Sequence, residues 1–147
     1  MEKISIPNTR EEAKFLVSRI SPYMLMDHLN PRDFEAVFTS PLPMLSECAA
    51  MRRNLAEDYV TMAVVHAQKL LNVSPKLEEN AIRKAAGYIL EDYAHLTIAD
   101  LALCMKLGIK GQLGTFHGRL DAQVVYDWFY TYNLRRAEAK RYWEAQF

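Results

Sequence analysis

The residues that could do chemistry are concentrated in one glycine-rich stretch, KGQLGTFHGRLD at positions 110–121, with Gly108 just before it. A phosphate-binding P-loop needs G-x-x-x-x-G-K-[ST] between a strand and a helix, and a dinucleotide site needs G-x-G-x-x-G in a βαβ unit. Neither spacing is present, and no strand pattern precedes the stretch. We therefore expect no nucleotide cofactor here, and nothing elsewhere in the chain indicates another cofactor.

A connection between two helices accounts for the same glycines more simply. Gly108 is predicted to end one helix in a left-handed conformation, and Gly111, Gly114 and Gly118 allow the positive φ of a reversing chain. Asp121 is predicted as the N-cap of the next helix, because its carboxylate can accept from a backbone N–H of the first turn. The residues that we assign to this structural loop are Asp100, Gly108, Lys110, Gly111, Gly114, Gly118, Arg119 and Asp121.

Asp100 lies in an apolar helical segment, where an unpaired buried carboxylate would be costly. We expect it to hold the loop by accepting hydrogen bonds from loop backbone N–H groups, or by pairing with Lys110 or Arg119. Two simpler alternatives stay open. Asp100 is exposed, or it caps its own helix as the third residue after Thr97.

Metal and nucleophile chemistry find little support in the sequence. His95, His117, Cys104 and Asp100 do not have the spacing of a recognised metal site, so we expect no bound metal. A Cys104–His117 nucleophilic pair is the alternative, although a thiol inside an apolar helix is usually inert. Cys48 lies near a predicted helix N-terminus, which can lower a thiol pKa. We expect both cysteines to be free, buried thiols.

The last predicted helix carries basic and aromatic side chains close together. Such a mixture can bind a nucleic-acid backbone and its stacked bases, or it can form a protein interface rich in Tyr and Arg. Basic groups near a helix C-terminus also favour the helix dipole without any ligand. The predicted binding surface consists of Tyr126, Tyr130, Arg135, Arg136, Lys140 and Arg141.

The elements that must position these residues are all predicted to be helices. Apolar residues recur at helical spacing, and no run alternates with period two. We predict an all-α, single-domain bundle of about six helices over residues 1–147, without a sheet. The predicted helices cover 9–20, 30–38, 46–72, 75–96, 98–107 and 121–145, with caps at Thr9, Asn30, Ser46, Ser74, Thr97 and Asp121.

Three of these helices have a predicted core stripe. In the helix 46–72 the stripe is Met51, Leu55, Tyr59, Met62, Val65 and Leu70; in 75–96 it is Ile82, Ala85, Ala86, Ile89, Tyr93 and Leu96. In the last helix the stripe is Val125, Trp128, Phe129, Tyr132, Ala139 and Trp143. The helix 98–107 is apolar on almost every side, so we expect it to be central.

Composition limits the function classes. Hydrophobic residues make up 50% and charged residues 24%, which is typical of a globular domain. Because 18 Lys+Arg balance 18 Asp+Glu, the chain has no global attraction to nucleic acid or to an anionic membrane. No signal-peptide core or membrane-length apolar run is visible, so we expect a soluble cytoplasmic protein without membrane association.

The segment 75–140 resembles a family of small, uncharacterised helical proteins from Bacteroidota chromosomes, prophages and mobile elements. The family pattern has a DY-x-x-L pair, then A-D, a lysine followed by two glycines, an aspartate, W-F, and Y-x-x-x-R. In this chain Leu113 stands where the pattern commonly has an aromatic residue. The matching positions are Asp92, Tyr93, Leu96, Ala99, Asp100, Lys110, Gly111, Gly114, Asp121, Trp128, Phe129, Tyr132 and Arg136. The resemblance implies no activity, and its genomic setting suggests phage or mobile-element biology, including replication.

Three hypotheses for function follow. The preferred one is a non-enzymatic helical module that binds a protein partner as an adaptor, in phage or mobile-element replication; a homo-oligomer is compatible with it. The second is a weak nucleic-acid binder that uses the basic, aromatic C-terminal helix. The third is an unrecognised enzyme built around the loop 108–121.

Overall fold

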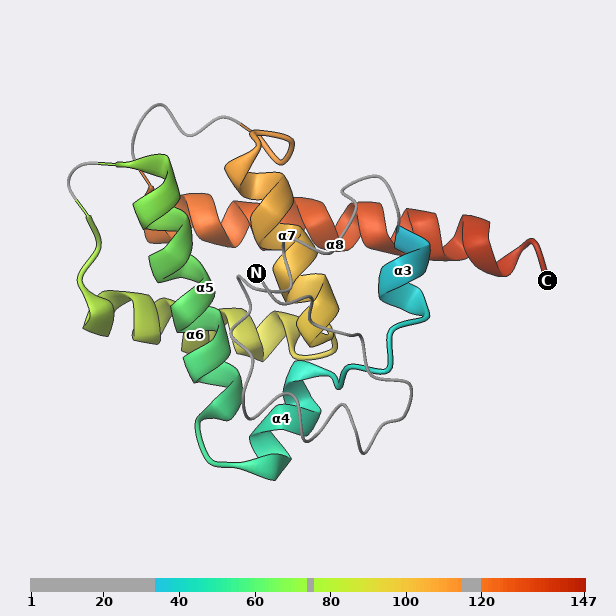
Figure 1. Ribbon diagram of the computed structural model, residues 1–147, viewed down its shortest axis with the longest axis horizontal. Coiled ribbons are helices and arrows are strands. Elements are labelled where there is room, and N and C mark those ends of the chain that lie inside the picture. Colours follow the sequence, from blue (N-terminus) through green and yellow to red (C-terminus); the bar gives the residue numbers. More distant parts are fainter. Residues whose placement is uncertain (1–33, 74–75, 115–119) are drawn as a thin grey trace, which may run out of the picture.

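The computed structural model describes residues 34–73, 76–114 and 120–147, and these fold into an all-α bundle (Figure 1). The helices in these ranges are α3 (Phe34–Phe38), α4 (Leu45–Met51), α5 (Leu55–Leu71), α6 (Glu79–Tyr93), α7 (Ile98–Ile109) and α8 (Ala122–Glu144). The strand-like pairing among the described residues is a single antiparallel bridge between Met44 and Thr97. The predicted fold class is therefore confirmed. The predicted helix 9–20 and the beginning of 30–38 lie outside the described residues.

The core forms around α7, which is buried on every side apart from Lys106 and Ile109. This confirms the expectation that the most apolar segment is central. The long helix α8 runs the length of the molecule, and α7 crosses it (Figure 1). Trp128, Phe129 and Tyr132 are the largest side chains that α8 buries against this core.

The predicted helix 46–72 is wrong in one respect, because the chain forms two helices there. The segment 52–54 separates α4 from α5, and Asn54 adopts a left-handed conformation with φ 66°. Asn tolerates this region better than most residues, so the break needs neither Gly nor Pro. The N-cap position of α4 is Met44 rather than Ser46, and the Glu47 carboxylate accepts from the Met44 N–H at 3.1 Å.

The break also changes which side chains are buried. Leu55 and Tyr59 belong to the core as predicted, whereas Met62 and Leu70 are 41% and 58% exposed. The buried face of α5 is instead completed by small and branched residues, namely Ala56, Val60, Ala63, Val64 and Ala67. The prediction extended one core stripe along a single continuous helix. It therefore placed the wrong face of the second half of that helix in the core.

The helix predicted at 75–96 is shorter, running from Glu79 to Tyr93, and its predicted cap at Ser74 lies outside the described residues. Its core stripe is confirmed, with Ala85 only partly buried; the buried members are Ile82, Ala86, Ile89, Tyr93 and Leu96. The predicted stripe is correct although the predicted helix ends are not, because the stripe depends on the helical period and not on the exact ends.

Backbone hydrogen bonds join α4 to the connection between α6 and α7. The Leu45 and Ser46 N–H groups donate to the Leu96 and Ala94 carbonyls at 2.7 and 3.0 Å. In return the Ile98 N–H donates to the Pro43 carbonyl at 3.0 Å. Helix ends carry backbone groups without intrahelical partners, and here the start of α4 satisfies groups at and just after the end of α6.

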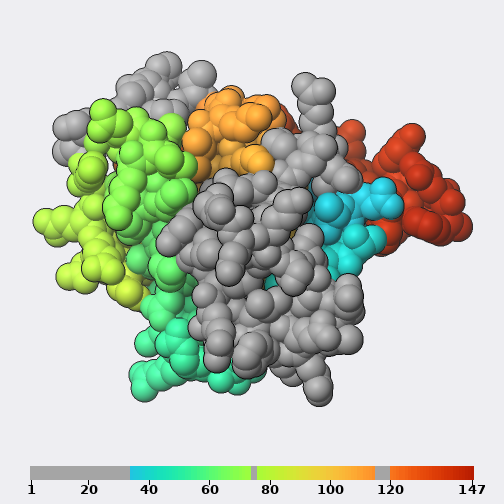
Figure 2. Space-filling model, viewed as in Figure 1, coloured from blue at the N-terminus to red at the C-terminus, as the bar shows by residue number. Residues whose placement is uncertain are grey.

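The C-terminal end of α8 projects past α3, which packs beside the second half of this helix (Figure 1 and Figure 2). Among the described residues, no helix has the length and apolar character needed to cross a bilayer.

Candidate functional site

The buried carboxylate of Asp100 is the centre of a hydrogen-bond network between α7 and α8. Its Oδ2 accepts from the Thr97 backbone N–H at 2.9 Å and from the Thr97 hydroxyl at 3.1 Å. Its Oδ1 accepts from the Tyr132 hydroxyl at 2.6 Å and from Arg136 Nε at 2.9 Å. Tyr132 and Arg136 are four residues apart on α8, so they lie on the same helix face and reach the same oxygen.

This geometry decides among the alternatives for Asp100. The capping alternative is confirmed, because the Thr97 hydroxyl also accepts from the Asp100 N–H at 3.1 Å and completes a capping box. The exposed alternative is wrong, because Asp100 is 0% exposed. The hydrogen bonds that Asp100 accepts come from Thr97 and from α8, and none comes from a described residue of the loop. For these residues, Lys110 included, the expectation that Asp100 holds the loop is wrong. Arg119 lies outside the described residues.

The network is closed to substrate. Asp100 is fully buried, and the Arg136 side chain is only 15% exposed. Burial, followed by the charge of the Asp100 carboxylate, raises the pKa of Tyr132 well above its ordinary value, so the phenol stays protonated and remains a donor. We interpret these residues as a structural link between α7 and α8 rather than as an acid–base site.

The loop after α7 begins with a helix stop that differs from the predicted one. Gly108 is not the terminating residue, because α7 continues to Ile109. Gly111 takes that role with φ 74°: its N–H donates to the Gly108 carbonyl, and the Gln112 N–H donates to the Leu107 carbonyl. This pair of bonds is a Schellman motif. Lys110 is the C-cap and is exposed.

Gly108 has a packing role instead. A Cβ at this position would lie 2.4 Å from the ring of Trp128, so only glycine allows α8 to approach α7 this closely. Gly114 has φ 117°, as expected of a reversing chain. Asp121 is confirmed as an N-cap, since its Oδ1 accepts from the Val124 N–H at 3.0 Å. Gly118 and His117 lie outside the described residues.

The remaining candidates for chemistry are occupied or buried. Cys48 and Cys104 are free and buried, as predicted. Burial raises the pKa of the Cys48 thiol to about 11 and that of Cys104 well above its ordinary value, so neither thiol is activated. His95 Nε2 lies 2.8 Å from Asn133 Oδ1. No group of three potential metal ligands occurs within the described part of the chain.

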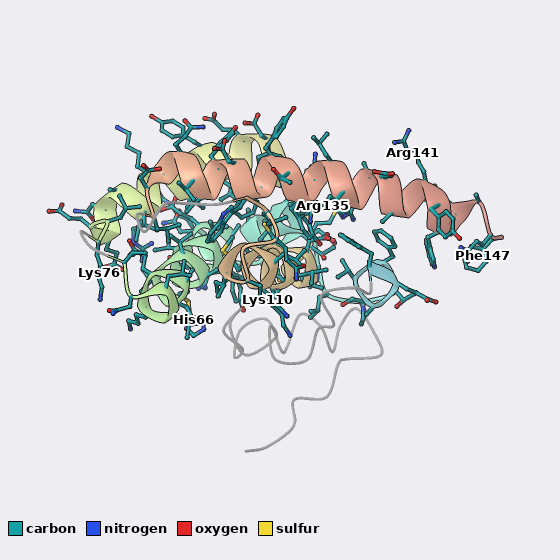
Figure 3. The ribbon with its side chains drawn as sticks, turned by 90° about the horizontal axis from the view of Figure 1, so that it is seen from above. His66, Lys76, Lys110, Arg135, Arg141 and Phe147 are labelled. Carbon is teal, nitrogen blue, oxygen red and sulfur yellow. The ribbon has the colours of Figure 1, made fainter. Side chains whose placement is uncertain are left out.

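The predicted binding surface does not form a single patch. Tyr126 is partly buried and donates its hydroxyl to Asp92, whereas Tyr130 is 58% exposed. Arg136 points inward to Asp100, which contradicts its assignment to the surface. Arg141 projects from the side of α8 that faces away from α3 (Figure 3).

Lys140 and Arg135, the other two basic residues of this set, also lie in different surroundings. Lys140 is half-buried, and Arg135 lines a groove between α3 and α8. The basic side chains are therefore spread around α8 rather than gathered on one face.

The groove beside Arg135 is the most distinctive surface feature of the described residues. It has a volume of about 500 Å³ and is lined by Phe34, Glu35, Phe38, Arg135, Glu138, Ala139, Tyr142, Trp143 and Gln146. The Phe38 and Trp143 rings are 5.4 Å apart between centroids, and Phe34 and Phe38 are 6.0 Å apart. The guanidinium of Arg136 lies over the Phe38 ring at 5.5 Å and so connects the groove to the buried network.

Trp143 is the residue of the groove that needs an explanation. It was predicted as core, yet it is only partly buried, and its indole Nε1 is shielded from solvent without any hydrogen-bond acceptor. Buried donors are nearly always paired, because leaving one unpaired costs free energy. Tyr142 beside it is 73% exposed, and Phe147 is 88% exposed.

A second hollow of about 450 Å³ lies along α5 and the start of α6. Its buried Thr61 hydroxyl also lacks a partner. Its Arg83 guanidinium, however, is already bound by the carboxylates of Asp58 at 2.8 Å, Glu79 at 3.5 Å and Glu57 at 3.8 Å. Because its guanidinium is already paired, this hollow is a weaker candidate for a binding site than the groove.

Comparison of the sequence with models of protein families, with curated proteins and with solved structures finds no match in any of the three.

Proposed function

We propose that this protein is a non-enzymatic helical interaction module whose docking surface is the groove between α3 and α8. The observation that carries the proposal is the aromatic lining of this groove, where Tyr142 is 73% exposed beside Trp143 and opposite Phe34 and Phe38. A docked polypeptide can cover these aromatic rings and remove their apolar surface from water.

The composition of the groove fits protein recognition. Aromatic residues and Arg are enriched at protein interfaces, and Tyr, Trp and Arg are over-represented among the residues that dominate binding energy. The groove brings Tyr142, Trp143 and Arg135 together on α8, opposite the two phenylalanines of α3.

The same observations favour a protein over a nucleic acid. Arg136 is paired with Asp100, and Arg135 and Arg141 lie on different sides of α8. A nucleic-acid backbone is recognised by basic groups clustered along one face. We also propose that the protein partner takes part in phage or mobile-element replication.

Photo-cross-linking in the native host tests the proposal. A benzophenone amino acid at position 142 is compared with the same group at position 88, because Tyr88 is also exposed but lies on α6. We expect an adduct with a polypeptide at position 142 and none at position 88. A nuclease-sensitive adduct would favour the nucleic-acid hypothesis instead, and equal labelling at the two positions would contradict a docking role for the groove.

A further inference from the structure

Two exposed apolar side chains of α8 lie outside the groove. Tyr130 and Leu134 are 58% and 55% exposed, and their i, i+4 spacing places them on one face of the helix. Arg141, two turns after Leu134, shares this face, and it projects from the side of α8 that faces away from α3 (Figure 3). The face is therefore separate from the groove and needs its own explanation.

The end of α6 lies beside this face of α8. Figure 1 shows the two helices running in the same direction, and side-chain contacts join them at two levels. The Tyr126 hydroxyl donates to the Asp92 carboxylate, and one turn further on His95 Nε2 lies 2.8 Å from Asn133 Oδ1. The end of α6, the turn after it and the first half of α8 therefore form one continuous surface.

This surface is acidic, although the whole chain is neutral. The segments 85–97 and 122–134 contain neither Lys nor Arg, and their carboxylates are Glu91, Asp92 and Asp127. All three side chains are exposed. Within the described ranges none of the three forms an ion pair, so their negative charge is not neutralised by the chain itself.

The acidic face has a basic residue at each end. Lys84 lies one turn before Tyr88 on α6, and Arg141 lies beyond Leu134 on α8. Tyr88 therefore belongs to the boundary, and position 88 remains a reference outside the face. The part of α8 from Tyr126 to Leu134 is about 12 Å long at the rise of an α-helix. This length fits a partner segment of about four extended residues or about two helical turns.

We propose that this acidic face docks a basic segment of a protein partner. Arginine side chains of the partner pair with Glu91 and Asp127, and one of them stacks on the ring of Tyr130, because a guanidinium binds both carboxylates and aromatic faces. Nucleic acid and anionic membrane do not fit, since the three carboxylates repel phosphate groups. The molecule then has two docking surfaces on different sides of α8, and this second surface does not depend on the groove.

Peptide binding to the full chain tests the proposal. The probe is a short fluorescein-labelled peptide of alternating Arg and Ala residues, and the charge control is the same peptide with Glu in place of Arg. We expect fluorescence anisotropy to show saturable binding of the arginine peptide at low ionic strength, weakened by added salt, and no binding of the glutamate peptide.

Charge reversal locates the binding site. The double variant Glu91→Lys, Asp127→Lys should weaken binding by more than about tenfold, because it places like charges opposite the peptide. The matched control is Glu78→Lys, Glu144→Lys, which makes the same change of net charge at exposed positions outside the face and should change binding by less than about twofold. The isosteric pair Glu91→Gln, Asp127→Asn keeps the test valid if the reversal impairs folding, and it should weaken binding by about threefold.

The aromatic part of the face is tested separately. Tyr130→Ala should weaken binding of the arginine peptide by about threefold, the scale of an exposed cation–π contact. Tyr142→Ala, which removes an exposed tyrosine from the groove, should leave this binding unchanged.

The two proposals fail in different ways. An arginine peptide that does not bind at low ionic strength, or that is weakened equally by both double charge reversals, would overturn the acidic docking face. Neither result bears on the groove, which is tested by cross-linking at position 142. In the same way, an absence of adducts at position 142 would end the docking role of the groove and leave the acidic face standing.

Discussion

At the scale of single residues, Asp100 shows how one side chain can fix the relation between two helices. Its Oδ2 caps the start of α7 through Thr97, and its Oδ1 accepts from Tyr132 and Arg136 on α8. A carboxylate accepts at both oxygens, which no neutral side chain of the same size can do. The pairing is buried, so removal of one partner leaves the others unsatisfied.

We expect Asp100→Asn to lower the free energy of unfolding by about 3 kcal/mol, because the new amide NH2 would face existing N–H and O–H donors and the Arg136 guanidinium would lose its counter-charge. Urea denaturation followed by circular dichroism measures this. The control is Asp127→Asn, an exposed position whose carboxylate accepts from Gln123 at 2.9 Å, and it should change stability by less than about 0.5 kcal/mol. An Asp100→Asn protein as stable as the wild type would show that the network is not a structural link.

The buried cysteines give a prediction about pH. Because burial raises the pKa of Cys48 to about 11, from an unfolded value near 9, the folded state holds more protons than the unfolded state between these two pH values. The contribution of this thiol to stability is therefore complete below pH 9 and is lost as the pH rises toward 11. Thermal melts across this range should show a falling midpoint.

A thiol-specific reagent provides the independent check. At mildly alkaline pH the folded chain should release no chromophore, and the chain in denaturant should release two equivalents, one for each cysteine. Fast labelling of the folded chain would mean that a thiol is reachable, and would reopen the nucleophile hypothesis for Cys48 or Cys104.

At the scale of the helices, two glycines inside helices have opposite roles. A Cβ at Gly108 would lie 2.4 Å from the Trp128 ring, whereas nothing lies within 4 Å of a Cβ at Gly87 on α6. The first position is needed for the contact of α7 with α8. The second position carries the usual entropic cost of glycine in a helix without a packing benefit.

The corresponding alanine variants should therefore move stability in opposite directions. We expect Gly108→Ala to destabilise the protein by about 3 kcal/mol, since overpacking in a closed core forces backbone shifts. Gly87→Ala should stabilise it by about 0.5–1 kcal/mol. Denaturant melts of both variants compare them directly, and a neutral Gly108→Ala would show that α8 can move away from α7 at little cost.

The helix ends show which contacts can be predicted from residues that are close together in the sequence. Thr97 and Asp121 could be predicted as N-caps because their partners are only three residues away. The role of Tyr132 and Arg136 could not be predicted, because they lie more than thirty residues from Asp100 and meet it only after the helices pack. The break at Asn54 was missed because a left-handed asparagine leaves no signal as strong as Gly or Pro.

At the scale of the whole molecule, the basic residues of α8 do not act as a unit. Arg136 is inside, Arg135 lines the groove, and Arg141 projects from the side away from α3. The sequence predicted one surface, because these residues are close together along the chain. They point to different sides of the helix, and only the packing of the bundle determines which side is covered. For the same reason Trp143 was predicted as core, although it is only partly buried.

We therefore expect only weak nucleic-acid binding, abolished at physiological salt, because few phosphates can be neutralised at one time. Fluorescence anisotropy with a labelled duplex and a labelled single strand, over a salt series, measures this. A steep salt dependence that is flattened by the double variant Arg135→Ala, Arg141→Ala would contradict the expectation and restore the nucleic-acid hypothesis.

The hydrogen bonds between α4 and the α6–α7 connection have a consequence for local opening of the native state. The amides of Leu45, Ser46 and Ile98 are held by carbonyls from segments far away in the sequence. If α4 moved away, the start of α4 and the end of α6 would lose their partners together, so α4 has no inexpensive way to detach alone. These three amides should then show one shared, high free energy of opening in deuterium exchange, close to that of global unfolding. The shortest helices of a bundle usually fray first, but α4 is expected to be among the last parts of this molecule to open.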